Sequence, residues 1–172
     1  MGSVAASGGY WVAMGGDHIF AGEQTITGSI GVFGLIPNLK QLAKTFGLNW
    51  DVVKTHPSAD IMSVSRAKSD KEISIVQSHV DRIYERFLSL VAENRDINMS
   101  RISEVAQGRV WMGQDAHELG LIDEFGTLGD SVAYTADKAG ITQFEIIDFP
   151  QVESPVDAIN QLFETSSNSG LE

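Results

Sequence analysis

The apolar positions of this chain change their spacing several times between residues 1 and 149. The clearest pattern lies in the middle, where apolar residues recur every three or four positions: Ile73, Val76, Val80, Ile83, Phe87 and Leu90. This spacing places side chains on one face of a helix. Ser69 and Glu72, just before it, form the sequence of a capping box. The pattern therefore predicts a helix from Ser69 to about Asn94.

Shorter helices and strands are predicted on both sides of this helix. Before it, we expect a helix over residues 7–14, strands over 18–22 and 25–34, a helix over 37–47, a strand over 49–55 and a loop over 56–66. After it, we expect helices over 99–107, 113–120 and 127–139, and strands over 109–112, 121–123 and 144–149. Because strands and helices alternate, the sequence predicts an α/β fold with a mostly parallel sheet and flanking helices.

The composition fits one globular domain followed by a polar tail. The chain has 172 residues, and 42% of them are hydrophobic, which is sufficient for a core. We expect the domain over residues 1–149. The tail, 150–172, holds one candidate short helix at 156–163 and ends in Leu171-Glu172, which resembles a cloning remnant, so we interpret the chain as an excised fragment.

Negative charge gathers in the C-terminal third of the chain. Residues 1–110 contain eleven acidic and eleven Lys or Arg residues, whereas residues 111–172 contain twelve acidic residues and only Lys138. Because an acidic surface repels phosphate groups, we expect no nucleic-acid partner. The absence of cysteine excludes disulfides and a thiol nucleophile. No cluster of metal ligands and no phosphate-binding loop occurs, so we expect no cofactor.

The sequence Ala-Ala-Ser-Gly-Gly at residues 5–9 surrounds one hydroxyl group with very small side chains. Small neighbours leave space for a substrate carbonyl, and a serine at the start of a helix lies beside free N–H groups. Ser7 is therefore a candidate nucleophile, and the N–H of Gly8 is a candidate oxyanion donor. The alternative is that Ser7 caps the helix and the glycines serve close packing.

A general base for Ser7 is not evident from the spacing of the four histidines. His79 and His117 fall on predicted helices, where a solvated or hydrogen-bonded role is the more common one. His18 and His56 fall beside turns, and nothing in their spacing requires either of them to approach Ser7.

Several motifs together resemble one known family. The segments SVAASGGYWVA, TITGSIGVFG, DIMSVSRA and VAQGRVWMGQDAHELGLIDEFG are similar, in sequence and in order, to the C-terminal catalytic half of the signal peptide peptidase A family. The resemblance covers about residues 1–149. It implies a Clp-protease/crotonase-type α/β fold and a serine peptidase of the bacterial inner membrane, with its catalytic domain facing the periplasm and its anchor outside this fragment.

The resemblance also implies roles for individual residues. Ser7 would attack the peptide carbonyl, Gly8 would supply one oxyanion N–H, and Ser29 would orient the general base. An extended substrate would pair with the backbone of a glycine-flanked strand formed by Gly31, Val32, Phe33 and Gly34. A second oxyanion donor would come from a glycine turn upstream of Met1.

The family uses a lysine as its general base, since desolvation lets an amine accept a proton near neutral pH. In short, self-sufficient members this lysine precedes the DIMS-like stretch, where the present chain has Ala59. One interpretation is the long, internally duplicated form, whose N-terminal half supplies the lysine; the other is a non-catalytic homologue. We favour the first because Ser7 and Ser29 are retained. Lys54 and Lys68 are expected to be solvated charges.

The resemblance implies hydrolysis of small apolar peptides, such as cleaved signal peptides, through an acyl-enzyme. The isolated fragment is expected to be inactive, and the family's rings or domes imply a homo-oligomer. A scaffold or binding module of the same fold is the main alternative. An enzyme that handles acyl-CoA is disfavoured by the nucleophilic serine, and the phage capsid-maturation branch is disfavoured by Ala59.

Overall fold

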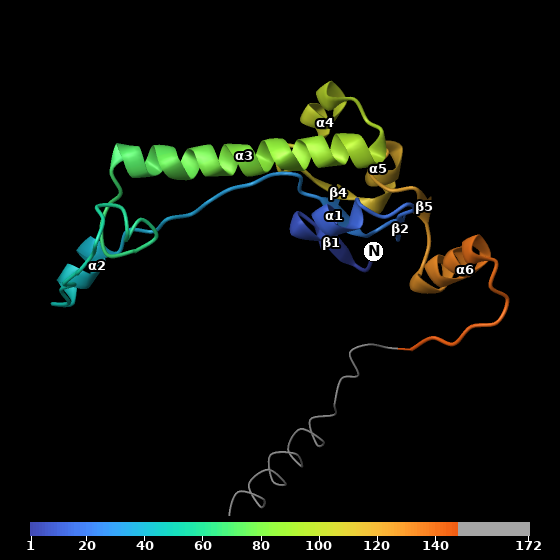
Figure 1. Ribbon diagram of the computed structural model, residues 1–172, viewed down its shortest axis with the longest axis horizontal. Helices are drawn as coiled ribbons and strands as arrows, with labels where there is room; N and C mark the ends of the chain where they lie inside the picture. Colours follow the sequence, from blue (N-terminus) through green and yellow to red (C-terminus); the bar gives the residue numbers. More distant parts are fainter. Residues whose placement is uncertain (148–172) are drawn as a thin grey trace, which may run out of the picture. The chain divides into compact units, whose positions relative to one another are not determined.

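The computed structural model describes residues 1–147 (Figure 1). The chain divides into two compact units, Met1–Ala133 and Tyr134–Glu172. The first unit contains all the strands described below and every candidate site residue. The expected boundary after residue 149 and the candidate helix at 156–163 lie outside the described residues and remain predictions.

Five short strands form two small sheets. β1 (Val4–Ala6), β3 (Ile26–Gly28) and β4 (Val110–Met112) form one sheet in the order β1-β3-β4, and β2 (Phe20–Ala21) pairs with β5 (Glu124–Phe125). β1 is parallel to β3, and β2 is parallel to β5, whereas β4 is antiparallel to β3. The α/β class is therefore confirmed, and two of the three strand pairings within residues 1–147 are parallel.

The helices are α1 (Gly8–Ala13), α2 (Lys40–Thr45), α3 (Asp70–Arg95), α4 (Met99–Val105), α5 (Gly113–Glu118) and α6 (Leu128–Ala139). The predicted long helix is confirmed as α3. Its capping box is complete, because the Ser69 hydroxyl accepts from the Glu72 N–H and the Glu72 carboxylate accepts from the Ser69 N–H. None of the helices in this part of the chain is both long and apolar enough to cross a membrane.

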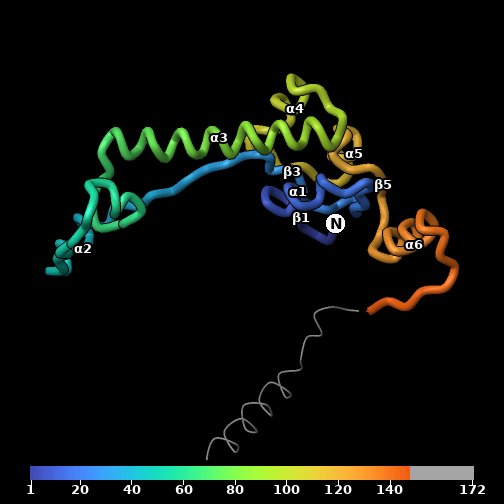
Figure 2. Tube along the Cα trace, in the orientation of Figure 1, coloured from blue at the N-terminus to red at the C-terminus, as the bar shows by residue number. Residues whose placement is uncertain are grey.

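The segment between β3 and α2 is extended and irregular, and it runs beside α3 (Figure 2). A Cβ placed on Gly34 would lie 3.9 Å from the Val80 side chain of α3. The chain then enters α2, which ends as predicted at Gly47, a residue with φ 71°. A loop returns the chain to the start of α3.

The core is formed mainly by α1 and the C-terminal half of α3, together with the segments around α4 and α5. It includes Tyr10, Met14, Ile30, Phe87, Val91, Ile102, Val105, Ala116, Leu121 and Ile122. The apolar stripe of α3 is buried only toward its C-terminal end, since Phe87 is 1% exposed and Ile73 is 53% exposed. The N-terminal half of the stripe therefore has no cover within the described chain.

Two polar links attach the helices to the segment before β5. The Tyr10 hydroxyl donates to the Leu121 carbonyl at 3.0 Å, and burial raises the pKa of Tyr10 above its ordinary value. Arg95 donates to both Asp123 carboxylate oxygens, at 2.9 and 2.6 Å. Burial acts to raise the pKa of Asp123, but hydrogen bonds from Arg95 and from the Ile19 N–H outweigh it and lower that pKa.

Three of the predicted strands are wrong. Residues 49–55 are irregular, residues 121–123 precede β5 instead of forming a strand, and residues 144–147 form none. The strand expected over 25–34 is limited to β3, and β1 was not predicted. Trp50, Val52 and Val53 are exposed by 47%, 45% and 98%, so this apolar stretch lacks the neighbouring strand that would order it.

Candidate active site

Ser7 lies at the sharp turn between β1 and α1. Its backbone is left-handed, with φ 52° and ψ −117°, an uncommon conformation for a residue with a side chain. The Ser7 N–H donates to the Gly28 carbonyl at 2.9 Å, and the Ser7 carbonyl accepts from the Trp11 N–H at 2.9 Å. The turn is thus held from the sheet on one side and from the helix on the other, with the serine exposed.

The space around Ser7 is open. The Ser7 side chain makes no capping hydrogen bond to α1. A Cβ on Gly8 would meet no atom within 4 Å, and one on Gly9 would meet only Ala5, at 3.9 Å. The interpretation of Ser7 as a side-chain cap among tightly packed glycines is therefore wrong.

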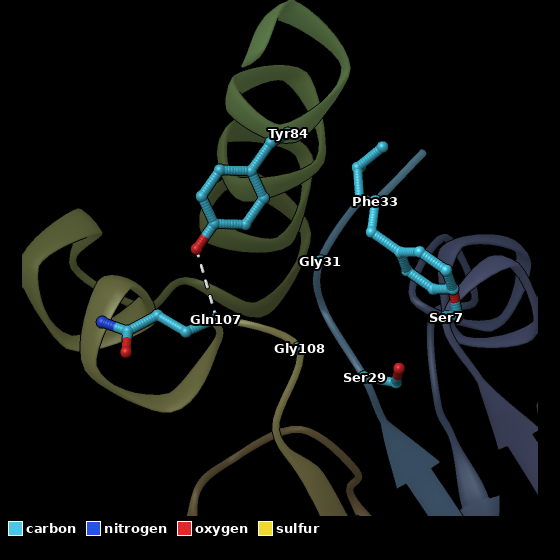
Figure 3. Close-up of a pocket in the computed structure, with 8 residues that line it drawn as sticks. Ser7, Ser29, Gly31, Phe33, Tyr84, Gln107 and Gly108 are labelled. Atoms are coloured by element: carbon cyan, nitrogen blue, oxygen red, sulfur yellow. Dashed lines mark hydrogen bonds between the residues drawn. The ribbon is translucent and has the colours of Figure 1, made fainter. Parts of the chain in front are cut away.

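Ser29 occupies the corresponding position at the end of the neighbouring strand. Ala6 of β1 pairs with Gly28 of β3, so Ser7 and Ser29 are the next residues of two adjacent parallel strands. Ser29 is also left-handed, with φ 50°, and its N–H donates to the Arg109 carbonyl at 2.7 Å. Figure 3 shows both serines at this end of the sheet.

Two cavities open beside Ser7. The larger, about 480 Å³, is lined by Ser7, Ser29, Gly31, Val32, Phe33, Tyr84, Gln107 and Gly108. The smaller, about 250 Å³, is lined by Ser7, Gly8, Trp11, Gly31, Val32, Phe33, Ile83 and Phe87. The structure thus brings together six of the seven candidate residues, whereas Gly34 lines neither cavity.

The segment Gly31–Gly34 is not a strand, and its first glycine has a reason internal to the protein. A Cβ on Gly31 would lie 2.8 Å from the Cα and N atoms of Gly108. The Gly108 N–H donates to the Ile30 carbonyl at 2.9 Å, which fixes this close approach. The close backbone contact expected here from a substrate is therefore made at Gly31 by the protein itself.

The two lysines near Ala59 are engaged within their own loop. Lys54 donates to the Pro57 carbonyl at 2.9 Å and to Asp60 at 3.0 Å. Lys68 donates to the carbonyls of Asp60 and Ser63 and is only partly exposed, so the expectation of a solvated Lys68 is wrong. Neither lysine lines a cavity at Ser7.

Ala59 lies in a loop that is attached to the start of α3. Arg66 joins Asp60, the neighbour of Ala59, to Glu72 at the first turn of the helix. The residues of α3 that line the cavities begin at Ile83. At about 1.5 Å per residue, Glu72 and Ile83 are about 16 Å apart along the helix axis. Position 59 is thus held near the end of α3 that lies away from the cavities.

The histidines do not line either cavity. The His18 ring lies 3.2 Å from a Glu124 carboxylate oxygen. His56 Nδ1 accepts from the Ser58 N–H at 3.2 Å, and the His117 ring packs against Phe125 with centroids 4.8 Å apart. No cluster of three or more metal-ligating side chains occurs among residues 1–147.

The sequence patterns missed the residues that α1, α3 and the turn after α4 contribute to the cavity walls: Trp11, Ile83, Tyr84, Phe87, Gln107 and Gly108. Ile83 and Phe87 belong to the predicted helical stripe, which indicated burial but not proximity to Ser7. Tyr84 carried no signal of its own, because its contact with Gln107 joins residues 23 positions apart.

The fold and this serine-centred site are those of a peptidase, and comparison with known proteins gives the family. Residues 1–142 match the model of Peptidase family S49, and the chain belongs to this family. A putative protease of Synechocystis is 38% identical over 99% of the chain and 61% of its own length. Protease 4 of Salmonella typhi is 40% identical over 91% of the chain and 25% of its own length. A putative signal peptide peptidase SppA of Enterococcus faecium is 34% identical over 86% of the chain and 43% of its own length.

The chain spans between a quarter and about three fifths of the length of these relatives. The resemblance to the signal peptide peptidase family is confirmed at the level of the S49 family.

Proposed function

We propose that this domain is a serine peptidase that cleaves peptides through an acyl-enzyme formed on Ser7. The observation that carries the proposal is the exposed, left-handed Ser7 between β1 and α1, which opens onto two cavities in a chain of a peptidase family. Nucleophilic serines on strand-to-helix turns are held in this manner in other hydrolases, because the turn exposes the hydroxyl to substrate.

In the proposed reaction the Ser7 oxygen attacks the peptide carbonyl carbon while a base takes the hydroxyl proton. The N–H of Gly8, at the open start of α1, donates to the developing oxyanion. The tetrahedral intermediate then expels the amine, which receives the proton from the base. Water attacks the resulting ester by the same route and restores the Ser7 hydroxyl.

We further propose that the base is a lysine from outside the described residues, supplied by the N-terminal half of the long, duplicated form of the protein. Two observations support this. No lysine or histidine among residues 1–147 lines the cavities. Ala59 replaces the lysine of self-sufficient members and is held near the start of α3. Ser29, beside Ser7, would orient the incoming amine, and the isolated fragment would be inactive.

The proposed substrates are apolar peptides, such as the remnants of cleaved signal peptides, and the Enterococcus relative carries this activity in its name. The side chains of Trp11, Ile83 and Phe87 give the smaller cavity an apolar wall that suits such peptides. Residues 31–33 line both cavities and would contact the extended chain.

We also propose a homo-oligomer on the Clp-protease/crotonase-type fold, located at the bacterial inner membrane with the domain on the periplasmic side. Oligomer formation is supported by large apolar side chains that are exposed on the segment from β3 to α3. Among them are Phe33, Leu35, Phe46, Val53 and Met62, each at least 69% exposed. Exposed apolar surface of this extent is typical of protein interfaces.

Labelling with a fluorophosphonate tests the proposal in the full-length protein. We expect one labelled site, lost in Ser7→Ala and retained in Ser3→Ala, which removes an exposed hydroxyl that lines neither cavity. Mass spectrometry of the labelled peptide identifies the serine. A folded full-length protein that takes up no label would contradict the proposal and favour a non-catalytic scaffold.

A further inference from the structure

The larger cavity contains a phenolic hydroxyl that the proposed reaction does not use. Three hydroxyl-bearing side chains line this cavity: Ser7, Ser29 and Tyr84. Ser7 and Ser29 have proposed roles in the reaction. Tyr84 comes from α3, and Figure 3 shows its ring extending from the helix toward the backbone of Gln107.

The hydrogen bonding of Tyr84 leaves its proton available. A tyrosine hydroxyl donates one hydrogen bond and accepts others. The Gln107 N–H donates to the Tyr84 oxygen at 3.2 Å, so the hydroxyl acts as an acceptor in this bond. Within residues 1–147 the Tyr84 proton has no acceptor on the protein. A partly buried hydroxyl beside the cavity therefore keeps an unused donor.

The backbone that orients this hydroxyl is held firmly. Gln107 and Gly108 are both left-handed, with φ 57° and 72°, and the Gly108 N–H donates to the Ile30 carbonyl. The Gln107 side chain is engaged elsewhere: its amide nitrogen donates to Ser103 at 3.1 Å, and its amide oxygen accepts from Arg109 at 3.3 Å. Only the backbone N–H of Gln107 meets Tyr84, and it fixes which side of the hydroxyl oxygen stays free to donate.

The chemistry of the cavity indicates a neutral acceptor. No Lys or Arg side chain lines it, so a carboxylate would enter without a counter-charge. Its other walls are mainly the backbone and apolar side chains of residues 31–33. An extended peptide offers one carbonyl oxygen per residue whatever its sequence. We infer that Tyr84 is a substrate-binding residue whose hydroxyl donates a hydrogen bond to a backbone carbonyl of the bound peptide; this inference rests on the proposed peptidase function.

The test measures peptide binding without turnover, in the full-length protein carrying Ser7→Ala. An apolar peptide is titrated by calorimetry, and Tyr84→Phe is expected to weaken binding about 3- to 10-fold, the loss typical of one neutral hydrogen bond. Tyr134→Phe, which removes a hydroxyl that lines neither cavity, should leave the affinity unchanged. Equal affinity for the protein with and without Tyr84→Phe would overturn the inference.

A second measurement separates donation to substrate from a purely structural link to Gln107. Incorporation of 3,5-difluorotyrosine at position 84 makes the hydroxyl a stronger donor and a weaker acceptor, and the assay is run at a pH where the phenol stays protonated. Tighter peptide binding supports donation to the substrate. Weaker binding indicates that the hydroxyl serves only as an acceptor for Gln107, and overturns the inference.

Replacing single peptide carbonyls by thiocarbonyls, which are weaker acceptors, identifies the partner. One position should lose affinity for the protein with Tyr84 and not for Tyr84→Phe; the same losses in both proteins at every position would contradict the inference. The fluorophosphonate experiment keeps the two proposals apart. Loss of the proposed function appears as an unlabelled Ser7, whereas a labelled protein whose affinity ignores Tyr84 contradicts only the present inference.

Discussion

Ser7 and Ser29 are the residues that directly follow the paired strand ends Ala6 and Gly28, and both have a left-handed backbone. Their φ angles are 52° and 50°. A residue with a side chain held in such a conformation costs about 1–3 kcal/mol, and such residues cluster at functional sites. Two of them side by side indicate that this end of the sheet is shaped by the needs of the site and not by stability.

The strain at Ser7 predicts an unusual order of stability among its variants. Ser7→Gly should be more stable than Ser7→Ala by about 1 kcal/mol, because glycine adopts positive φ at no steric cost. Urea unfolding of the two variants measures the difference. Ser3, which has no positive φ, is the matched control: there the glycine variant should be the less stable one. The same order at both positions would show that Ser7 is not strained.

The close approach of Gly31 to Gly108 predicts a position that does not tolerate a methyl group. Gly31→Ala should destabilise the protein by about 1–3 kcal/mol, because the new Cβ would lie 2.8 Å from backbone atoms that cannot rotate away. The matched control is Gly34→Ala, whose Cβ would lie 3.9 Å from a Val80 methyl group, an ordinary contact. Thermal unfolding of both variants gives the comparison, and equal melting temperatures would contradict the packing argument.

The sequence was most informative where local physical rules decide the structure. The start of α3 was predicted correctly because the Ser69 and Glu72 capping box and the apolar spacing act within the helix itself. The end of α2 was also predicted, because Gly47 can adopt the left-handed backbone that closes a helix.

The sequence was least informative where a structure depends on partners far along the chain. The strand expected over residues 49–55 has suitable residue types but no neighbouring strand, and it is irregular. In contrast, β1 is only three residues long and was not predicted, yet it exists because β3 pairs with it. The cavity walls were missed for the same reason, since Tyr84 and Gln107 come together only through the tertiary fold.

The ion pair between Arg95 and Asp123 predicts a strong effect of a single substitution. The Arg95 side chain is 8% exposed and that of Asp123 is 27% exposed. Arg95→Met should destabilise the protein by about 2–3 kcal/mol, somewhat less than for a fully buried pair, because the remaining carboxylate loses its charge partner. Adding Asp123→Asn should recover part of the loss, because the amide needs no counter-charge. Chemical denaturation of the single and double variants tests this, and additive losses would rule out coupling.

The cluster around Arg66 predicts that the loop at residues 54–68 detaches from α3 in acid. Arg66 donates to Asp60 at 2.7 and 2.6 Å and to Glu72 at 2.9 and 2.5 Å, and these hydrogen bonds hold the pKa values of both carboxyl groups below their ordinary values. Because the pKa values are lowered in the folded state, the cluster stabilises the loop above the ordinary values of 3.8 and 4.5. The stabilisation is lost as the pH falls below them.

Amide hydrogen exchange measures this attachment directly. The Ile61 and Ser63 N–H groups donate to the Ser58 and Asp60 carbonyls within the loop, so their protection factors report whether it is ordered. We expect protection at pH 6 that declines progressively below about pH 5, as the carboxylates take up protons. Arg66→Gln should remove the protection already at pH 6 and with it the dependence on pH. The matched control, Arg101→Gln, breaks an exposed pair with Glu104 and should leave the loop unchanged. Protection that persists at pH 3 would show that the loop is held by contacts other than this cluster.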